Sequence, residues 1–191
     1  MVTLSGASRS VSSTRLPTPR ADRGGERRGV SEIVIRPERD SDREAIRRIN
    51  LAAFDGPVEA GLVDRLRSAG CDFLSWVADE RGDVVGHILF TPVTIGDPSE
   101  TSQQASLGNP PRVAGLAPMA VRPDRQGRGI GSALVERGLA ACRDAGFAAV
   151  VVLGHADYYP RFGFRPASRW ELRYEVDVPD EVFLALELRR G

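Results

Sequence analysis

Residues 116–132 read LAPMAVRPDRQGRGIGS, and they decide the fold because an apolar strand ends there in a glycine-rich turn that leads into a helix. The first turn of a helix offers backbone N–H groups without intrahelical partners and carries the positive end of the helix dipole. Arg125 and Arg128 add positive charge at the same place. The stretch therefore predicts an anion-binding site, above all for phosphate.

The spacing of the glycines separates three kinds of phosphate-binding turn. A P-loop requires a lysine after its second glycine, and the chain contains no lysine. A dinucleotide-binding turn requires G-x-G-x-x-G, but Ser132 stands where the third glycine after Gly127 and Gly129 belongs. The run from Gln126 to Gly131 instead has the pattern Q-x-x-G-x-G, which by itself also suits a tight turn that binds nothing.

Composition limits the classes of protein to consider. The 191 residues suffice for one domain of ordinary size with some chain to spare. No apolar run approaches the roughly 20 residues that a membrane span requires, so we expect no membrane partner. The net charge is zero, and outside the arginine-rich first 30 residues the chain is mildly acidic, which argues against nucleic acid as a partner.

The two cysteines bear on metal binding and location. Cys71 and Cys142 lack the spacing of a zinc site or a disulfide framework, so we expect no metal and a reducing cytoplasm. Residues 1–31 are rich in Ser, Arg, Gly and Pro, and they carry too few apolar side chains to offset the entropy of ordering. We therefore predict a disordered tail, rather than a targeting segment, followed by one domain at 32–191.

Apolar periodicity and turn residues predict the order of helices and strands. The expected elements are a strand at 33–37, a helix capped by Ser41 and Glu44, a helix at 59–69, strands at 73–80 and 84–95, a strand at 113–121, a helix at 129–145, a strand at 148–153, a short helix at 156–162, and strands at 170–176 and 181–188. The polar segment 96–112 is the longest expected internal loop.

Three of these strands carry further information. The strand at 84–95 is apolar on both alternating faces, with Val84, Ile88 and Phe90 on one and Val85, Leu89 and Val93 on the other, so we expect cover on both sides. Pro118 interrupts the strand at 113–121, and because proline cannot donate to a strand ladder, it predicts a bulge. That strand, the following helix and the apolar strand at 148–153 form a βαβ unit, which makes the two strands parallel.

A second motif follows about thirty residues after Gln126. Residues 158–164 read YYPRFGF, which is similar to a segment that many GNAT domains carry after the strand beyond their coenzyme loop. With the Q-x-x-G-x-G run before it, the chain from Ile33 to Leu188 resembles the GNAT superfamily of acetyl-CoA-dependent N-acetyltransferases, in particular putative acetyltransferases of bacteria.

The resemblance implies an α/β fold with a mixed sheet of six to seven strands, helices on both faces, and a splayed pair of strands ending at Val121 and Leu153. It implies acetyl-CoA as the cosubstrate, with the pantetheine arm lying in the splay and the pyrophosphate on the glycine turn. The expected coenzyme-binding residues are Met119, Ala120, Val121, Gln126, Gly127, Arg128, Gly129, Ile130, Gly131 and Ser132. No side chain at the three glycines is expected to block close approach.

The resemblance also implies direct attack of an amine on the thioester within a ternary complex. A backbone N–H near Met119 or Ala120 stabilises the oxyanion, and Tyr159 protonates the leaving thiolate as the general acid. Tyr159 also suits an aromatic cluster, to which we assign Tyr158. Glu59 is the catalytic candidate for the base, although a glutamate there also suits a helix start, and His87 and His155 are the other candidates. An asparagine common in the family near His155 is missing.

The acceptor stays open from the sequence. A small-molecule amine and a protein amine both fit an N-acetyltransferase, and oligomeric state is also open, a homodimer included. A noncatalytic acyl-CoA-binding regulatory module is the alternative, because it would keep the glycine turn without needing Tyr159. A nucleotide-dependent redox protein is a third class and predicts NAD binding.

Overall fold

The computed structural model describes residues 2–3, 33–54, 56–95 and 111–188 of the chain. The strands in these ranges are β1 (Val2–Thr3), β2 (Ile33–Pro37), β3 (Leu74–Glu80), β4 (Asp83–Ile95), β5 (Val113–Val121), β6 (Ala149–Leu153), β7 (Arg165–Pro166) and β8 (Phe183–Glu187). The α-helices are α1 (Arg43–Ala53), α2 (Val58–Ser68) and α3 (Ile130–Asp144). Short 3-10 turns are η1 (Asp40–Asp42), η2 (Pro123–Arg125), η3 (Tyr159–Phe162) and η4 (Ala167–Trp170).

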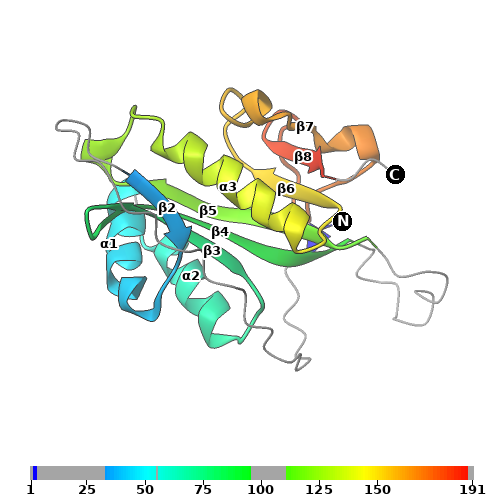
Figure 1. The fold of residues 1–191 in the computed structure, drawn as a ribbon. Coiled ribbons are helices and arrows are strands. Elements are labelled where there is room, and N and C mark those ends of the chain that lie inside the picture. The colour runs from blue at the N-terminus through cyan, green and yellow to red at the C-terminus, as the bar shows by residue number, and fades with distance from the viewer. Residues whose placement is uncertain (1, 4–32, 55, 96–110, 189–191) are drawn as a thin grey trace.

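The described strands form one mixed sheet. Seven of them follow the order β2-β3-β4-β5-β6-β8-β7, and β1 pairs with β4 off this path. Neighbours are antiparallel except β5 and β6, which are parallel and joined through α3. Helix α3 covers one face of the sheet, and α1 and α2 cover the other (Figure 1). The predicted α/β class, the mixed sheet and the βαβ unit are confirmed.

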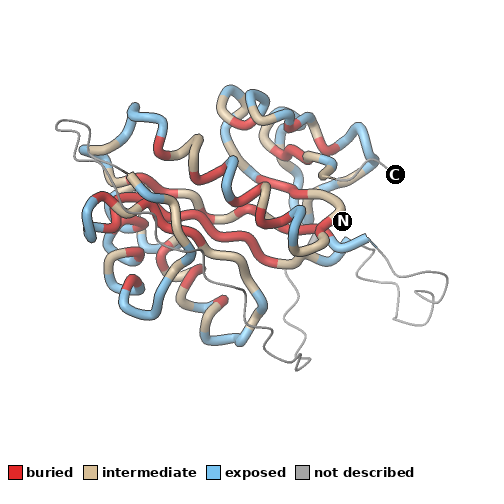
Figure 2. Tube along the Cα trace, in the orientation of Figure 1, coloured by how far each residue is buried: buried red, intermediate tan, exposed pale blue. Residues whose placement is uncertain are grey.

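Each face of the sheet has its own apolar core. Under α3, side chains of β4 such as Ile88 and Phe90 pack with Leu134 and Leu139. On the other face, Leu89 of β4 packs with side chains of α1 and α2. The central strands are therefore the most continuously buried part of the chain (Figure 2). Burial on both faces explains why β4 is apolar at almost every position.

A bulge in β4 changes which residues share a face. Val84 lies in the core on the α1 and α2 side, whereas Val85 lies in the core on the α3 side, opposite to our assignment. The register explains the exchange, because Ala78 pairs with Gly86 and Asp79 with Val84, which leaves Val85 as the extra residue. One extra residue reverses the alternation that sequence periodicity assumes.

The bulge expected at Pro118 is confirmed. Ile88 pairs with Met119 and Phe90 with Leu116, so two residues of β5, Ala117 and Pro118, stand opposite one residue of β4. The irregularity therefore falls where proline removes the N–H donor.

The start of α1 differs from the predicted capping box. The N-cap residue of α1 is Asp42 rather than Ser41, and its carboxylate accepts the backbone N–H of Arg39 before η1, at 2.7 Å, instead of an N–H of α1. The same carboxylate binds the guanidinium of Arg36 from β2, which lowers the pKa of Asp42. An ion pair to a neighbouring strand, which the local sequence does not reveal, thus fixes the Asp42 side chain before α1.

Two predictions near the C-terminus are wrong in part. The segment 170–176 is not a strand, because η4 ends at Glu171 in the left-handed region with φ 59° and only Tyr174 forms an isolated bridge. The short helix at 156–162 is reduced to η3, with turn residues before it. Side chains of the predicted strand still pack, since Leu172 and Tyr174 cover a third core around Phe183.

Several expectations fall wholly or partly outside the described residues. Val2 and Thr3 pair with Ile95 and Thr94 as β1, but residues 4–32 are not described, so the disordered tail stays a prediction. Residues 96–110 of the expected loop are also not described. In the parts that are described, no helix has the length and apolar character to span a membrane.

Candidate functional site

Strands β5 and β6 separate partway along their length. Their pairing ends at Leu116 with Val152, although β5 continues to Val121. Beyond that point β6 pairs only with β8, to Leu153. We call residues 117–121 the parted segment. Its backbone groups that point away from β4 have no strand partner, so an extended ligand can bond to them as an added strand does. The expected splay is confirmed.

The parted segment leads through η2 into the glycine loop, residues 126–132. The Gln126 side chain begins the loop and donates from Nε2 to the carbonyl of Val121 at 3.0 Å, which fixes it to the end of β5. Gly127 and Gly129 have φ of 73° and 80°, where a side chain is strained. This conformation turns the chain sharply into α3.

The backbone N–H groups of the glycine loop are available to a ligand. The first helical bond runs from the Ala133 N–H to the Gly129 carbonyl at 3.0 Å. Among the described residues, no acceptor takes up the N–H groups of residues 127–132. These donors, with the positive end of the α3 dipole, are of the kind that anions bind.

The three loop glycines differ in the space beside them. At Gly127 and Gly129 a Cβ would meet nothing within 4 Å. At Gly131 a Cβ would lie 2.6 Å from the Tyr158 hydroxyl and 3.5 Å from the Met119 sulfur. Glycine at residue 131 therefore leaves room for the Tyr158 hydroxyl beside the first turn of α3.

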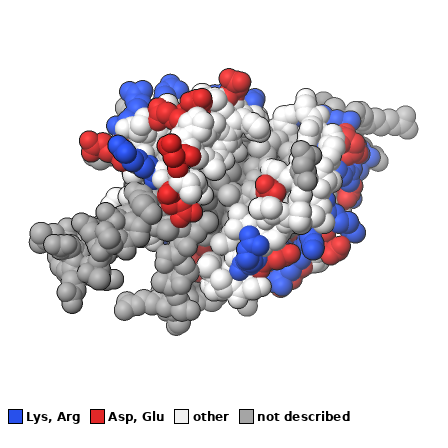
Figure 3. Space-filling view, turned by 180° about the vertical axis from the view of Figure 1, so that it is seen from behind, with Lys and Arg blue, Asp and Glu red and all other residues white. Residues whose placement is uncertain are grey.

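The two arginines near the loop have different roles. Arg125 binds the carboxylates of Glu80 and Asp124 at 2.7 and 2.6 Å, and these contacts raise its pKa. Arg128 is exposed and makes no ion pair with another described residue. Of the two, only Arg128 has its charge available for a bound anion. The Arg122 guanidinium is also paired, with Asp83 and Asp124. On the face seen in Figure 3, basic and acidic side chains of the described residues intermingle.

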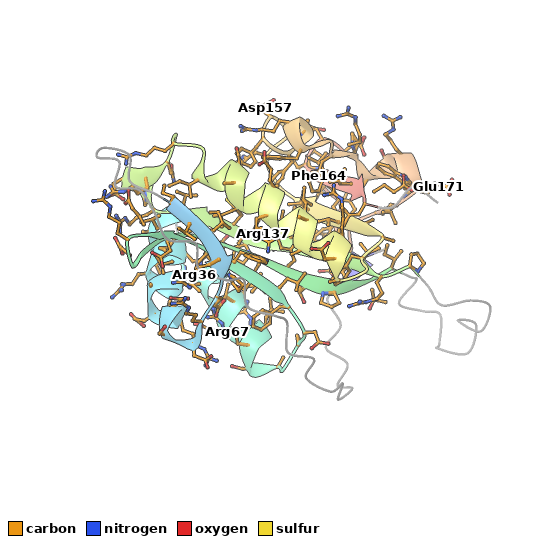
Figure 4. The ribbon with its side chains drawn as sticks, in the orientation of Figure 1. Arg36, Arg67, Arg137, Asp157, Phe164 and Glu171 are labelled. Atoms are coloured by element: carbon orange, nitrogen blue, oxygen red, sulfur yellow. The ribbon has the colours of Figure 1, made fainter. Side chains whose placement is uncertain are left out.

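Tyr159 is held in an aromatic cluster. Its ring makes edge contacts with Tyr158 and Phe164, at centroid distances of 5.1 and 5.6 Å, and Figure 4 labels Phe164 beside this part of the molecule. A Cβ at Gly154 would lie 2.3 Å from the ring, so the glycine makes room for it. Burial raises the pKa of Tyr159 to about 12, so the phenol stays protonated at neutral pH.

His87 is unsuited to act as a base. Its side chain is fully buried, and both ring nitrogens have partners, Asn50 Nδ2 at 3.4 Å and Ser75 Oγ at 3.0 Å. Burial and the nearby guanidinium of Arg67 lower the pKa of His87 to about 3. A neutral imidazole that accepts from Asn50 and donates to Ser75 satisfies all these contacts.

The other two base candidates reach solvent. Glu59 is half-buried in the first turn of α2, and His155 is exposed just after β6. Among the described residues, no hydrogen bond or ion pair joins either side chain to Tyr159. The structure therefore brings Tyr159, the parted segment and the start of α3 into one region, and no hydrogen bond or ion pair joins Glu59 to them in the described residues.

Sequence reasoning missed two features of this region. The ring of Tyr158 packs against the main core, as expected, but the position of its hydroxyl beside the first turn of α3 was not foreseen. The one sequence signal for a role of Tyr158 in the site was its position next to Tyr159 in the YYPRFGF motif. The buried polar chain from His87 through Ser75 to Glu38 and Arg67 was also missed (Figure 4 labels Arg67). Its members lie far apart in the chain, so no spacing could reveal it.

A comparison with known families matches this arrangement. The sequence model of the acetyltransferase (GNAT) family matches residues 43–164, from the start of α1 to the end of the YYPRFGF motif. The chain belongs to the GNAT family. A GNAT acetyltransferase is an acyltransferase that uses an acyl-CoA, which agrees with the splayed strands and the glycine loop.

Similar proteins come from other bacteria. The uncharacterized N-acetyltransferase YjhQ of Escherichia coli (strain K12) is 39% identical over 130 residues, which are 67% of each chain. The uncharacterized N-acetyltransferase YhbS of the same strain is 35% identical over 142 residues, 74% of this chain and 78% of YhbS.

Two solved structures share the fold of this GNAT protein. A GNAT acetyltransferase from Brucella melitensis in complex with acetyl-CoA has a TM-score of 0.65 and 37% identity, covering 84% of this chain and 91% of that one. YhbS from Escherichia coli in complex with CoA has a TM-score of 0.74 and 31% identity, covering 86% of each.

Proposed function

We propose that this GNAT protein moves an acetyl group from acetyl-CoA to a primary amine by direct attack within a ternary complex. The observation that carries the proposal is the continuity of the parted segment with the glycine loop, since one offers unpaired strand edge and the other unpaired N–H donors. We assign this activity to residues 32–191 as the catalytic domain, and propose a cytoplasmic location, in line with the free thiols of Cys71 and Cys142.

The residues present suit the coenzyme. The pyrophosphate would take the N–H groups of residues 127–132, with Arg128 adding charge, and the pantetheine arm would run along Met119, Ala120 and Val121. Ile130 is buried and anchors the first turn of α3 rather than facing the ligand. The relatives solved with acetyl-CoA and with CoA support the same cosubstrate here.

The chemistry follows from the reactants. The amine nitrogen attacks the thioester carbonyl carbon, the carbon–sulfur bond breaks, and the sulfur leaves as a thiolate. Holding the amine and the thioester in a reactive orientation can supply about 7 to 11 kcal/mol of the rate enhancement. A backbone N–H near Met119 or Ala120 would stabilise the oxyanion, worth about 3 kcal/mol for one donor.

Two side chains handle the protons in this proposal. Tyr159 donates its proton toward the thiolate as the general acid. Because the pKa of Tyr159 is about 12, full transfer to a thiolate is uphill, and the benefit comes from sharing the proton while negative charge develops on sulfur. Glu59 would accept the proton of the amine through water, since it is the one reachable carboxylate at the start of α2.

Thiol release in the presence of acetyl-CoA and a panel of small amines and peptides tests the proposal. We expect release that depends on one class of acceptor, and a fall in kcat of at least tenfold in Tyr159→Phe. Tyr174→Phe is the matched control, because Tyr174 packs on Phe183 in the third core. Coenzyme binding without release for any amine would favour the noncatalytic module, and unchanged kcat in Tyr159→Phe would remove the assigned acid.

A further inference from the structure

The hydroxyl of Tyr158 is buried and has no hydrogen-bond partner among the described residues. A buried hydroxyl left unpaired is costly, because folding has stripped it of water without giving a replacement bond. Buried donors without partners in native proteins therefore call for an explanation, and a ligand that binds later is one.

The ring of Tyr158 is firmly placed. It packs against the ring of Tyr159 at 5.1 Å and that of Phe162 at 5.5 Å between centroids, and the guanidinium carbon of Arg161 lies 4.1 Å from its centroid. Arg161 is in turn fixed by a bond from Nε to the Tyr158 carbonyl at 2.9 Å. With the ring held on these sides, the hydroxyl has one definite position.

That position borders both elements of the proposed coenzyme site. The hydroxyl stands 2.6 Å from where a Cβ on Gly131 would lie, in the first turn of α3. The sulfur of Met119, in the parted segment, lies 3.5 Å from the same point. The hydroxyl thus lies where the glycine loop gives way to the gap between β5 and β6.

We propose that the Tyr158 hydroxyl donates a hydrogen bond to the phosphopantetheine arm of the bound coenzyme, as a binding residue separate from Tyr159. The inference rests on the proposed function of this same site. Burial raises the pKa of Tyr158, against the effects of Ser132 and Arg161, so the hydroxyl keeps its proton and acts as a donor.

The position of the Tyr158 hydroxyl favours the phosphopantetheine arm, rather than the pyrophosphate, as its hydrogen-bond partner. The open, positive-φ glycines that expose the loop N–H groups are Gly127 and Gly129, whereas the hydroxyl is beside Gly131, one step further into the helix. The amide carbonyls of the arm are acceptors that the parted segment alone cannot all satisfy, since alternate backbone groups of β5 point toward β4.

The contact also explains why residue 131 is glycine. Any side chain at residue 131 would displace the Tyr158 hydroxyl, since the clash would be at 2.6 Å. Glycine at residue 131 thus lets the Tyr158 hydroxyl lie beside the first turn of α3.

Calorimetric titration of Tyr158→Phe with two ligands tests the proposal without any acceptor. One ligand is CoA, and the other is adenosine 3′,5′-bisphosphate, which lacks the arm. We expect the Kd for CoA to rise about 2- to 10-fold and the Kd for the bisphosphate to stay the same. The melting temperature of the free protein should not fall, because the lost hydroxyl had no partner. Tyr174→Phe is the control for a tyrosine outside the site.

Three results would overturn the inference: an unchanged Kd for CoA, an equal loss for both ligands, or a lower melting temperature of free Tyr158→Phe, which would indicate a structural bond. Failure of the proposed function looks different, since the wild-type protein itself would then not bind CoA. Circular dichroism of each variant establishes that it is folded before titration.

Discussion

The Arg125 guanidinium, just before the glycine loop, lies 2.7 Å from the carboxylate of Glu80 at the end of β3. Arg125 also holds Asp124, so its charge is already balanced by two carboxylates of the protein. Arg128, three residues on, is exposed and unpaired among the described residues. Two arginines that look equivalent in the sequence therefore have separate tasks, one structural and one open to a ligand.

Comparing the variants Arg128→Gln and Arg125→Gln separates the ligand-binding task of Arg128 from the structural task of Arg125. We expect Arg128→Gln to weaken CoA binding about 2- to 5-fold at low salt and to reduce the salt dependence of the Kd, since an exposed charge acts through a screened field. Arg125→Gln should lower the melting temperature with the salt dependence retained. Equal effects of both changes on the salt dependence would contradict this division.

Alanine at Gly127 or Gly129 should cost about 1–2 kcal/mol of stability each, because both positions have positive φ. CoA binding should weaken as well, since the strained loop reorients its N–H groups. Gly56→Ala is the matched control, because a Cβ there meets nothing within 4 Å and its φ is not positive. Urea unfolding measures the difference, and equal stabilities of the three variants would argue against the strain.

Gly138→Ala tests the packing of α3 on the sheet. A Cβ there would lie 2.2 Å from Cε2 of Phe90, a ring fully buried in the core. Overpacking costs about 1–3 kcal/mol, and the gain in helix propensity is about 1 kcal/mol, so we expect a net loss of stability. Phe90→Leu should make the alanine tolerable, and a double-mutant cycle with additive effects would refute direct contact.

The buried His87 should make stability depend on pH. Its pKa is about 3 when folded and about 6.5 when unfolded, so between these values only the unfolded state takes up the proton. Stability should therefore be fully present above pH 6.5 and fall as the pH drops, by up to about 1.4 kcal/mol per pH unit. Urea unfolding at pH 7.0 to 4.5 measures the slope, and this range lies above the titration of carboxylates such as Asp42.

The control for this slope is His87→Gln, which keeps amide groups for Asn50 and Ser75 but cannot titrate in this range. The variant should be less stable at neutral pH, while its stability should change much less between pH 7.0 and 4.5. A variant that keeps the full slope would assign the pH dependence to another group.

Much of the fold could be predicted because its signals are local. Apolar runs and turn residues predicted β2 to β6, Pro118 predicted the bulge, and the glycine-rich turn predicted the start of α3. The segment 170–176 was wrongly predicted as a strand. Its apolar side chains pack on a core although the backbone forms turns, and periodicity does not distinguish this arrangement from a short strand. The glycine loop and Tyr159 could be named as site candidates from the sequence, since each belongs to a short motif.

The sequence by itself determined the order of elements, the parallel pair flanking α3, and the turn that exposes N–H groups, since each depends on residues near one another in the chain. Three features were decided only by the tertiary structure: the ion pair of Arg125 with Glu80, the full burial of His87, and the position of the Tyr158 hydroxyl beside Gly131. These contacts join residues tens of positions apart, and strand register and helix packing, not local pattern, bring them together.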